Sequence, residues 1–464
     1  MSSETLLIAR VAFWLLAALV VLLPVRWSTL AFLLLVQFDL SGTATYTAES
    51  LGIENAIKVT LIPTILLWRM KEEISFDSRF AKLRHIWLFF AGYACLAILW
   101  SPFKLPALKM LGYFYAYCVL FIVFTIAWRK GWFNARSLMI VLWLSLLFAF
   151  VQTYGLGNEY GSVGNFYGSI DYEFRFTSFT GAQSFAAFLL SLFVLLVFCE
   201  EWNFAIFAAA AGATTGLILT GSRSIFLGFC WILLLAGVIF AKRKGKKLSL
   251  GVVAKRMTVG AVVLLVVGTV VLIALPENRL NQMLSASVSS DRTLEDVGTF
   301  VWRFSLYQKT IEELAHRRAA TLLTGSGTSS AAALVLDSGF FQQFNVDPNR
   351  AMHDEFLRSL YEWGLPGLLL LLLFLGEAVR ICVRLIRETD SKEAWAFLAI
   401  LAPLLISLTV ENFLAESASP GGVGYALVLT SMLARSGLQP KPQPAPAFDL
   451  FPKHSIATGA WRPL

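Results

Sequence analysis

The sequence predicts an all-α polytopic membrane protein with about 12 transmembrane helices and one long extracytoplasmic loop containing amphipathic helices. Of its 464 residues, 57% are hydrophobic and only 15% are charged, whereas a soluble domain carries roughly 25% charged residues. The mean hydropathy is +0.68. Apolar runs of about 18 residues or more, long enough to cross a bilayer, recur from end to end.

Polar stretches divide the chain into four parts. We expect an N-terminal transmembrane bundle (1–275), an outer-face loop with amphipathic helices (276–364), C-terminal transmembrane helices (365–435) and a disordered cytoplasmic tail (436–464). The tail is rich in proline and lacks periodicity, which is typical of disorder.

The apolar segments follow one another with short polar connections. They lie near 5–23, 28–40, 54–68, 86–101, 107–128, 137–155, 181–199, 203–220, 225–241, 258–275, 365–385, 393–410 and 422–434. No small-residue cleavage pattern follows the first segment, so we expect an anchor there instead of a signal peptide. The segment 28–40 is short for a bilayer about 30 Å thick. If it spans, Met1 lies outside, and if it is partial, Met1 is cytoplasmic.

Basic residues set the orientation of the bundle. They gather in four short loops: 69–85, 128–136, 241–256 and 380–392. Counting the spans between these loops places all four on one side, and the bias of basic residues toward the cytoplasm identifies that side. The opposite, outer face then carries the loop 156–180, the turn "LTGSRSIF" and the segment 276–364.

Several classes of chemistry lack their sequence signatures. The net charge of +8 comes mostly from the orienting loops, so we expect no nucleic-acid partner. The five cysteines lie in or beside apolar segments and form no disulfide framework or metal-binding pattern. Neither a nucleotide-binding loop nor a metalloprotease or aspartate-rich metal motif occurs. We therefore expect no metal and no cofactor, and an outer-face enzyme would need a substrate that is already activated.

The long outer segment has its own pattern. Loops beyond about 12–15 residues are usually functional or disordered. Here Trp302, Leu306, Thr310 and Leu314 repeat on a helical step, which predicts an amphipathic helix able to lie on a membrane surface. A glycine-rich turn, "TGSGTSS", follows.

A histidine precedes the next span, in "AMHDEFLRSLYEWGLPG". His353 is expected to open a helix that runs to about Trp363, before "GLPG" breaks it. Asp354 and Glu355 would lie in the first turn, where negative charge is favoured, and are possible supporting residues. The same dipole disfavours protonation of His353, which suits it as a general base. Alternatively, His353 only caps or packs the helix.

Outer-face arginines point to an anion. Arg223 lies between two spans on the outer side, against the positive-inside bias, and pairing with an anion explains it. Arg303 and Arg175 are further candidates. Arginine binds phosphate oxygens bidentately, so together they would form a cradle for a diphosphate. Alternatively, Arg223 snorkels to outer headgroups and the other two are ordinary solvated charges.

Three stretches in order, "TGSRSIFLGF", "VWRFSLYQKTI" to "LLTGSGTSS", and "HDEFLRSLYEWGLPG", resemble the bacterial O-antigen ligase and polysaccharide polymerase superfamily. The resemblance covers about residues 170–410. It implies a metal-independent inverting glycosyltransferase of the bacterial inner membrane, with its active site facing the periplasm and an undecaprenyl-diphosphate-linked glycan as donor. By motif, Arg223 and Arg303 match the family's diphosphate-binding arginines and His353 its essential histidine.

The chain departs from the family in one visible place. The family often has His-Asn where this chain has His353-Asp354, and the extra carboxylate would alter the basicity of the histidine or signal a different acceptor. The family usually has twelve spans with both termini inside, which favours a partial span at 28–40.

The acceptor separates the remaining interpretations. A polymerase extends a lipid-linked repeat unit, a ligase passes the chain to lipid A–core, and a third subgroup uses protein hydroxyls. We favour a polymerase, because the long loop shows no dedicated basic surface for the phosphorylated core. Expected partners are the donor, a glycan or lipid A–core acceptor, membrane lipids and other polysaccharide-assembly proteins. A transporter or flippase stays an alternative because Glu377 and Glu411 lie in or near late spans, although no internal repeat supports it.

Overall fold

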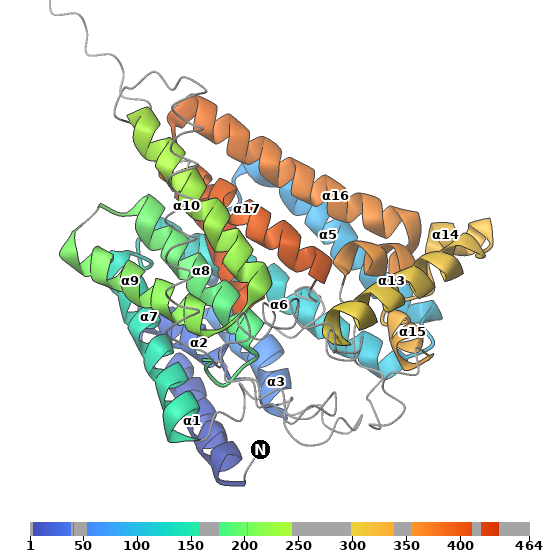
Figure 1. Ribbon diagram of the computed structural model, residues 1–464, viewed down its shortest axis with the longest axis horizontal. Coiled ribbons are helices and arrows are strands. Elements are labelled where there is room, and N and C mark those ends of the chain that lie inside the picture. The colour runs from blue at the N-terminus through green and yellow to red at the C-terminus, as the bar shows by residue number, and fades with distance from the viewer. Residues whose placement is uncertain are drawn as a thin grey trace, which may run out of the picture.

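The computed structural model describes residues 3–38, 40, 53–156, 176–201, 203–243, 298–337, 354–410 and 419–435. Every regular element in these ranges is a helix (Figure 1), as the predicted fold class requires. Some predicted features lie outside the described residues: His353, Arg175, Glu411, the apolar segment 258–275 and the tail 436–464.

The N-terminal helices are α1 (Ser3–Leu22), α2 (Val25–Leu35), α3 (Ile53–Ala56), α4 (Ile62–Arg69), α5 (Ala81–Leu96), α6 (Lys104–Arg129), α7 (Ala135–Phe150), α8 (Ala182–Cys199), α9 (Phe204–Leu219) and α10 (Arg223–Arg243). The later helices are α13 (Gly298–Ala315), α14 (Ala319–Thr324), α15 (Ala331–Asp337), α16 (Glu355–Thr389), α17 (Lys392–Val410) and α18 (Pro420–Arg435). Short 3-10 turns flank α5, and π-helical turns join α3 to α4 and end α7.

Within the described residues, 6 helices are long and apolar enough to cross a membrane. They are Thr5–Leu22, Ser78–Trp100, Lys104–Arg129, Ala135–Gly155, Ala182–Cys199 and Lys392–Thr409, with shorter apolar helices at Val25–Leu35, Phe204–Leu219, Ser224–Gly237 and Pro420–Ala434. The helix α2, which overlaps the predicted segment 28–40, has 11 residues and is about 16 Å long. That is about half a bilayer. A multi-pass membrane protein is confirmed, and the count of about 12 spans stays a prediction.

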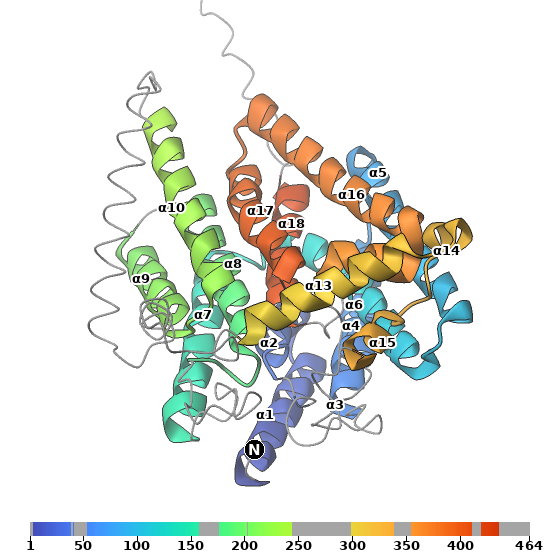
Figure 2. The ribbon, with the colours of Figure 1, turned by 45° about the vertical axis from the view of Figure 1, so that its right-hand side comes forward.

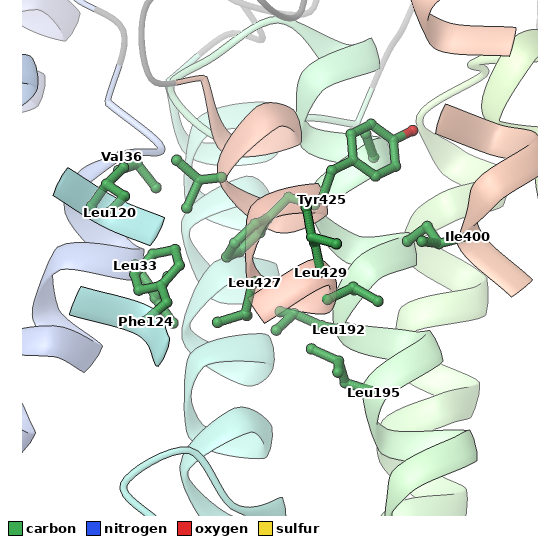
Figure 3. Packing of buried hydrophobic residues seen from close by; sticks show 14 of the residues in the cluster. Leu33, Val36, Leu120, Phe124, Leu192, Leu195, Ile400, Tyr425, Leu427 and Leu429 are labelled. Atoms are coloured by element: carbon green, nitrogen blue, oxygen red, sulfur yellow. The ribbon is translucent and has the colours of Figure 1, made fainter. Parts of the chain in front are cut away.

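The centre of the bundle is formed by α8 and α18. Of the apolar window of α8, 94% is buried inside the protein, and α18 packs against α6, α8 and α17. Figure 3 shows this packing, with labelled side chains that include Leu427 and Leu429 of α18, Leu192 and Leu195 of α8, Leu120 and Phe124 of α6, Ile400 of α17 and Leu33 of α2. A helix that is apolar on all sides fits such a position, because it needs no polar face.

One end of the bundle gathers three of the four basic loops. Arg129 Nη1 donates to the carbonyl and hydroxyl oxygens of Ser75, at 2.9 and 2.8 Å. Lys130 lies 2.6 Å from a Glu73 carboxylate oxygen. Glu377, one of the two glutamates that left a transporter as an alternative interpretation, lies 3.4 Å from Lys82 and also pairs with Arg380. We call this the basic end. Its cytoplasmic location remains a prediction, and most of the fourth loop lies outside the described residues.

The opposite end carries the starts of α8, α10, α16 and α18. The Phe176 N–H donates to the Leu219 carbonyl at 3.1 Å, and the Gly421 N–H donates to Ser184 Oγ at 3.0 Å. The helix α13 belongs to this end, and both ribbon views show it beside the first part of α16 (Figure 1, Figure 2).

The predicted amphipathic helix exists as α13. Leu306, Thr310 and Leu314 are buried on one face of it, as the periodicity predicts. The side chain of Trp302 lies outside the description. This apolar face packs inside the protein on Ala331 and Leu334 of α15 and on Tyr361 of α16. Neighbouring elements therefore already cover the face that would meet lipid if the helix lay on a membrane surface.

Candidate functional site

The helix that follows His353 begins at Glu355, two residues later than predicted. Asp354 is the N-cap residue, and its Oδ1 accepts from the backbone N–H groups of Phe356 and Leu357, both at 2.8 Å. Such a cap satisfies amides that the first turn leaves free. The expectation that His353 opens the helix is thus corrected, since the described helix starts at Glu355. Burial raises the pKa of the Asp354 carboxyl, and the two amide hydrogen bonds oppose that shift.

A buried ionic ladder runs along the first turns of α16. Arg358 Nη1 lies 3.1 Å from Glu355 Oε2, and its Nη2 lies 3.2 Å from Glu362 Oε2. The three side chains are at most 1% exposed. Spacings of three and four residues place them on one helix face. Glu355, expected as a supporting residue, is thus an ion-pair partner of Arg358. Arg358 was not among the residues predicted from the sequence; the spacing in "EFLRSLYE" allows the ion pairs but does not show that they are buried.

The glycine-rich turn and the helix break form one joint. The N–H groups of Ser326 and Gly327 donate to the carbonyl oxygens of Tyr361 and Glu362, at 3.0 and 2.9 Å. Those carbonyls are available because α16 breaks at Gly364, whose φ of 64° and ψ of −165° are not helical. A side chain at Gly364 would place Cβ 2.5 Å from the Leu323 carbonyl oxygen. Both features were predicted separately, and the structure brings them together.

Side chains fasten this joint to α5 and to Ser101, which lies beyond the end of that helix. Trp363 Nε1 donates to Thr328 Oγ1 at 3.0 Å, and Thr328 Oγ1 donates to the Ala94 carbonyl. Ser101 Oγ donates to the Thr328 carbonyl at 2.6 Å. These residues are buried. The residues after His353 are therefore held against the transmembrane bundle by hydrogen bonds to a transmembrane helix.

Further contacts fasten α13 to the same part of α16. The Tyr361 hydroxyl donates to Glu313 Oε1 at 2.8 Å, and the Arg317 guanidinium lies 3.6 Å from the Tyr361 ring centroid. Arg317 also lies 3.2 Å from Glu313. Burial, with the hydrogen bond to Glu313, raises the pKa of Tyr361, so its phenol stays protonated and keeps donating.

The predicted arginines lie on elements that meet at this end. Arg223 is the first residue of α10, and Arg303 lies in α13, but the structure does not describe either side chain. A Cβ added at Gly228 of α10 would touch Pro403 of the antiparallel α17. Counting five residues from that contact along the two antiparallel helices puts position 223 level with Leu408, the residue before Thr409.

The carbonyl of Thr409 connects this level to α13. It accepts from the Tyr307 hydroxyl at 2.9 Å, and Tyr307 lies one helical turn after Arg303. Positions 223 and 303 therefore come to the same end of the bundle, where Asp354 also begins α16. The contact that each of these side chains makes with a substrate stays a prediction, as does the role of His353.

Comparison with protein families matches residues 207–372 to a family described as O-antigen ligase. The matched segment includes positions 223, 303 and 353, the ladder and the joint, and it excludes Arg175. Comparison with curated proteins gives no match.

Proposed function

We propose that this chain, whose residues 207–372 match a family described as O-antigen ligase, is a membrane glycosyltransferase. It would move a glycan from a lipid-linked donor to an acceptor hydroxyl at the end of the bundle where α10, α13 and α16 begin. The observation that carries the proposal is the fixed start of α16, because it directly follows His353 and lies inside the matched segment.

The proposed donor is a glycan on undecaprenyl diphosphate. Arg223 and Arg303, with Arg175 as a further candidate, would bind the diphosphate oxygens bidentately and stabilise the charge that builds as it leaves. An activated diphosphate leaving group needs no nucleotide or metal to drive transfer. The bundle end that holds these positions lies opposite the basic end, and the positive-inside rule assigns it to the periplasm.

The proposed step is a single displacement. The acceptor oxygen forms a bond to the anomeric carbon while the carbon–oxygen bond to the diphosphate breaks, and the diphosphate departs with the electron pair. His353, as general base, takes the proton of the acceptor hydroxyl. Attack from the side opposite the diphosphate inverts the anomeric centre.

The buried ladder supports this role for His353. A general base must lie within hydrogen-bond reach of the proton it removes, so its backbone has to be held in place. The Asp354 cap and the ion pairs of Arg358 fix the first turn of α16. The joint at Gly364 fixes the other end of this first part of α16, where the helix breaks. These residues are positioning residues, and none is proposed to touch the substrate.

We favour repeat-unit polymerisation, with ligation to lipid A–core as the second candidate. The polymerase proposal rests on the absence, in the sequence of the long outer segment, of a dedicated basic surface for a phosphorylated core. The ligase candidate is favoured by the description of the matched family.

The test replaces His353 by alanine in cells whose own copy of the gene is deleted. We expect H353A to abolish glycan transfer. The matched control is H316A, because His316 is an exposed histidine at the end of α13, where Nδ1 contacts only the Glu312 carbonyl among the described residues. Normal transfer by H353A would overturn the proposal.

The glycans on the carrier then identify the acceptor. Single repeat units stalled on the carrier, without long polymer, indicate a polymerase. Long chains on the carrier beside bare lipid A–core indicate a ligase and overturn our preference.

A further inference from the structure

A cavity of about 150 Å³ lies at the basic end, and none of its lining residues belongs to the ladder or to the joint. It lies between α5, α6, the later part of α16 and the end of α18. Its walls are mostly apolar, with Leu83, Trp87, Ile122, Phe374 and Leu433 among them. The glycosyl-transfer proposal gives this cavity no role.

The depth of the cavity matches one leaflet of a bilayer. Its inner part reaches Cys118, whose sulfur accepts from Trp87 Nε1 at 3.3 Å. Its mouth reaches Arg129, at the end of the same helix. The helical rise puts these two positions about 16 Å apart, which is half the thickness of a hydrocarbon core of about 30 Å.

The mouth of the cavity carries two arginines, Arg84 and Arg129. Arg84 lies with its guanidinium 4.5 Å from the Phe76 ring centroid, and Arg129 is held by Ser75. In the described part of the chain, neither has a carboxylate oxygen within 4.0 Å. Both are half-buried, and each is oriented by a neutral group.

The carboxylate at the mouth, Asp77, attracts Arg129 through space but forms no ion pair within 4.0 Å with Arg84 or Arg129 among the described residues. Asp77 forms its ion pair with Arg79, whose Nε donates to both carboxylate oxygens. The side-chain hydrogen bond from Arg79 is the main cause that holds the pKa of Asp77 below its ordinary value. Two positive charges therefore stand at the mouth of an apolar slot, at the level where lipid headgroups meet the protein.

We propose that this cavity binds an anionic phospholipid, with one acyl chain in the slot and the phosphate between Arg84 and Arg129. The apolar walls match the chain, and the arginines match the headgroup phosphate. Phe76 and Leu88, which line the cavity, are exposed, so an apolar surface continues from the cavity to the outside of the protein. The occupant would fill the space between α5 and α16, the two helices whose far ends carry the joint. This proposal stands independently of the glycosyl-transfer proposal.

The test uses the full chain purified in detergent. Native mass spectrometry measures retention of phosphatidylglycerol and phosphatidylcholine with identical acyl chains. We expect the natural chain to retain phosphatidylglycerol about tenfold or more in preference, because two basic residues near the headgroup favour the anionic lipid. The double variant R84Q/R129Q should lose this preference. The matched control is R136Q, which removes an exposed arginine at the same end that does not line the cavity.

A second variant tests the apolar slot without touching the charges. T125F fills the cavity from the α6 wall, where Thr125 is half-buried, and it should lower retention of both lipids. Equal retention of the two lipids by the natural chain, or unchanged retention by both variants, would overturn the proposal. Preferential retention of a polyprenyl diphosphate over phosphatidylglycerol would also overturn it and assign the cavity to the donor.

Discussion

At the scale of single residues, Arg358 is the side chain on which the start of α16 depends most. It is 1% exposed and lies between two carboxylates that are equally buried. Desolvation of a buried ion is costly, and ion pairing offsets that cost only when the geometry is complete. The main effect of the ladder is therefore to fix where α16 begins, and its net contribution to the stability of the folded protein is small.

Removing Arg358 alone should destabilise the protein strongly. R358M leaves Glu355 and Glu362 without their shared cation, and breaking a buried pair in this way costs about 3–5 kcal/mol. The triple variant E355Q/R358M/E362Q removes all three charges and should recover most of the loss. Thermal unfolding in detergent measures both. A stability of R358M close to that of the natural chain would contradict the prediction that Glu355 and Glu362 depend on Arg358 as their shared cation.

The cap residue Asp354 should show both a capping effect and a pH effect. D354A loses the acceptor for two amides and should cost about 1 kcal/mol. D354N keeps an acceptor without the charge. Because the pKa of Asp354 is raised in the folded state, the natural chain loses stability as pH rises from the ordinary value of 3.8 through the folded pKa. D354N has no such loss, so its stability relative to the natural chain should increase over that window and then stay constant.

Thermal unfolding at several pH values measures this difference. A stability difference between D354N and the natural chain that is independent of pH would show that Asp354 does not titrate as its burial indicates.

At the scale of elements, the joint between the glycine-rich turn and α16 connects the outer helices to the bundle. Gly364 has a positive φ and an extended ψ, a region open essentially to glycine alone. The backbone of Gly325 faces it, since a Cβ there would lie 2.3 Å from the Glu362 carbonyl oxygen. Close approach of two backbones requires both glycines.

Substitution at Gly364 should therefore loosen α13 and α14 from α16. G364A should lower stability by at least about 1–3 kcal/mol from backbone strain, with a further cost from contact with the Leu323 carbonyl oxygen. The matched control is G376A in the same helix, where an added Cβ meets nothing within 4 Å. It should be neutral or slightly stabilising. Limited proteolysis and thermal unfolding compare G364A with G376A. Equal stabilities of the two variants would contradict the claim that the joint requires glycine at position 364.

The elements themselves were largely predictable from sequence, and their contacts were not. A helical step of apolar residues predicted α13, and "GLPG" predicted the break in α16. Sequence alone did not show that Leu306 and Leu314 pack on Tyr361, because an apolar face is equally suited to lipid and to protein. Arg358 was overlooked because its significance depends on burial, which local spacing does not reveal.

At the scale of the whole molecule, the chain is a helical bundle with two chemically different ends. The basic loops at 69–85, 128–136 and 380–392 come together at one end through Arg129, Lys130 and Lys82. Their common side was predictable because the positive-inside bias acts on every loop separately. The central position of α8 was not predictable, because a helix that is apolar on all sides has the same sequence pattern whether lipid or protein surrounds it.

The central claim is that the end carrying α10, α13 and α16 transfers a glycan with His353 as base. The most direct measurement incubates the purified full chain with a diphosphate-linked lipid carrying one repeat unit, which serves as both donor and acceptor. We expect longer lipid-linked glycans from the natural chain and from H316A, and none from H353A despite an unchanged unfolding temperature. Equal elongation by H353A would contradict the account.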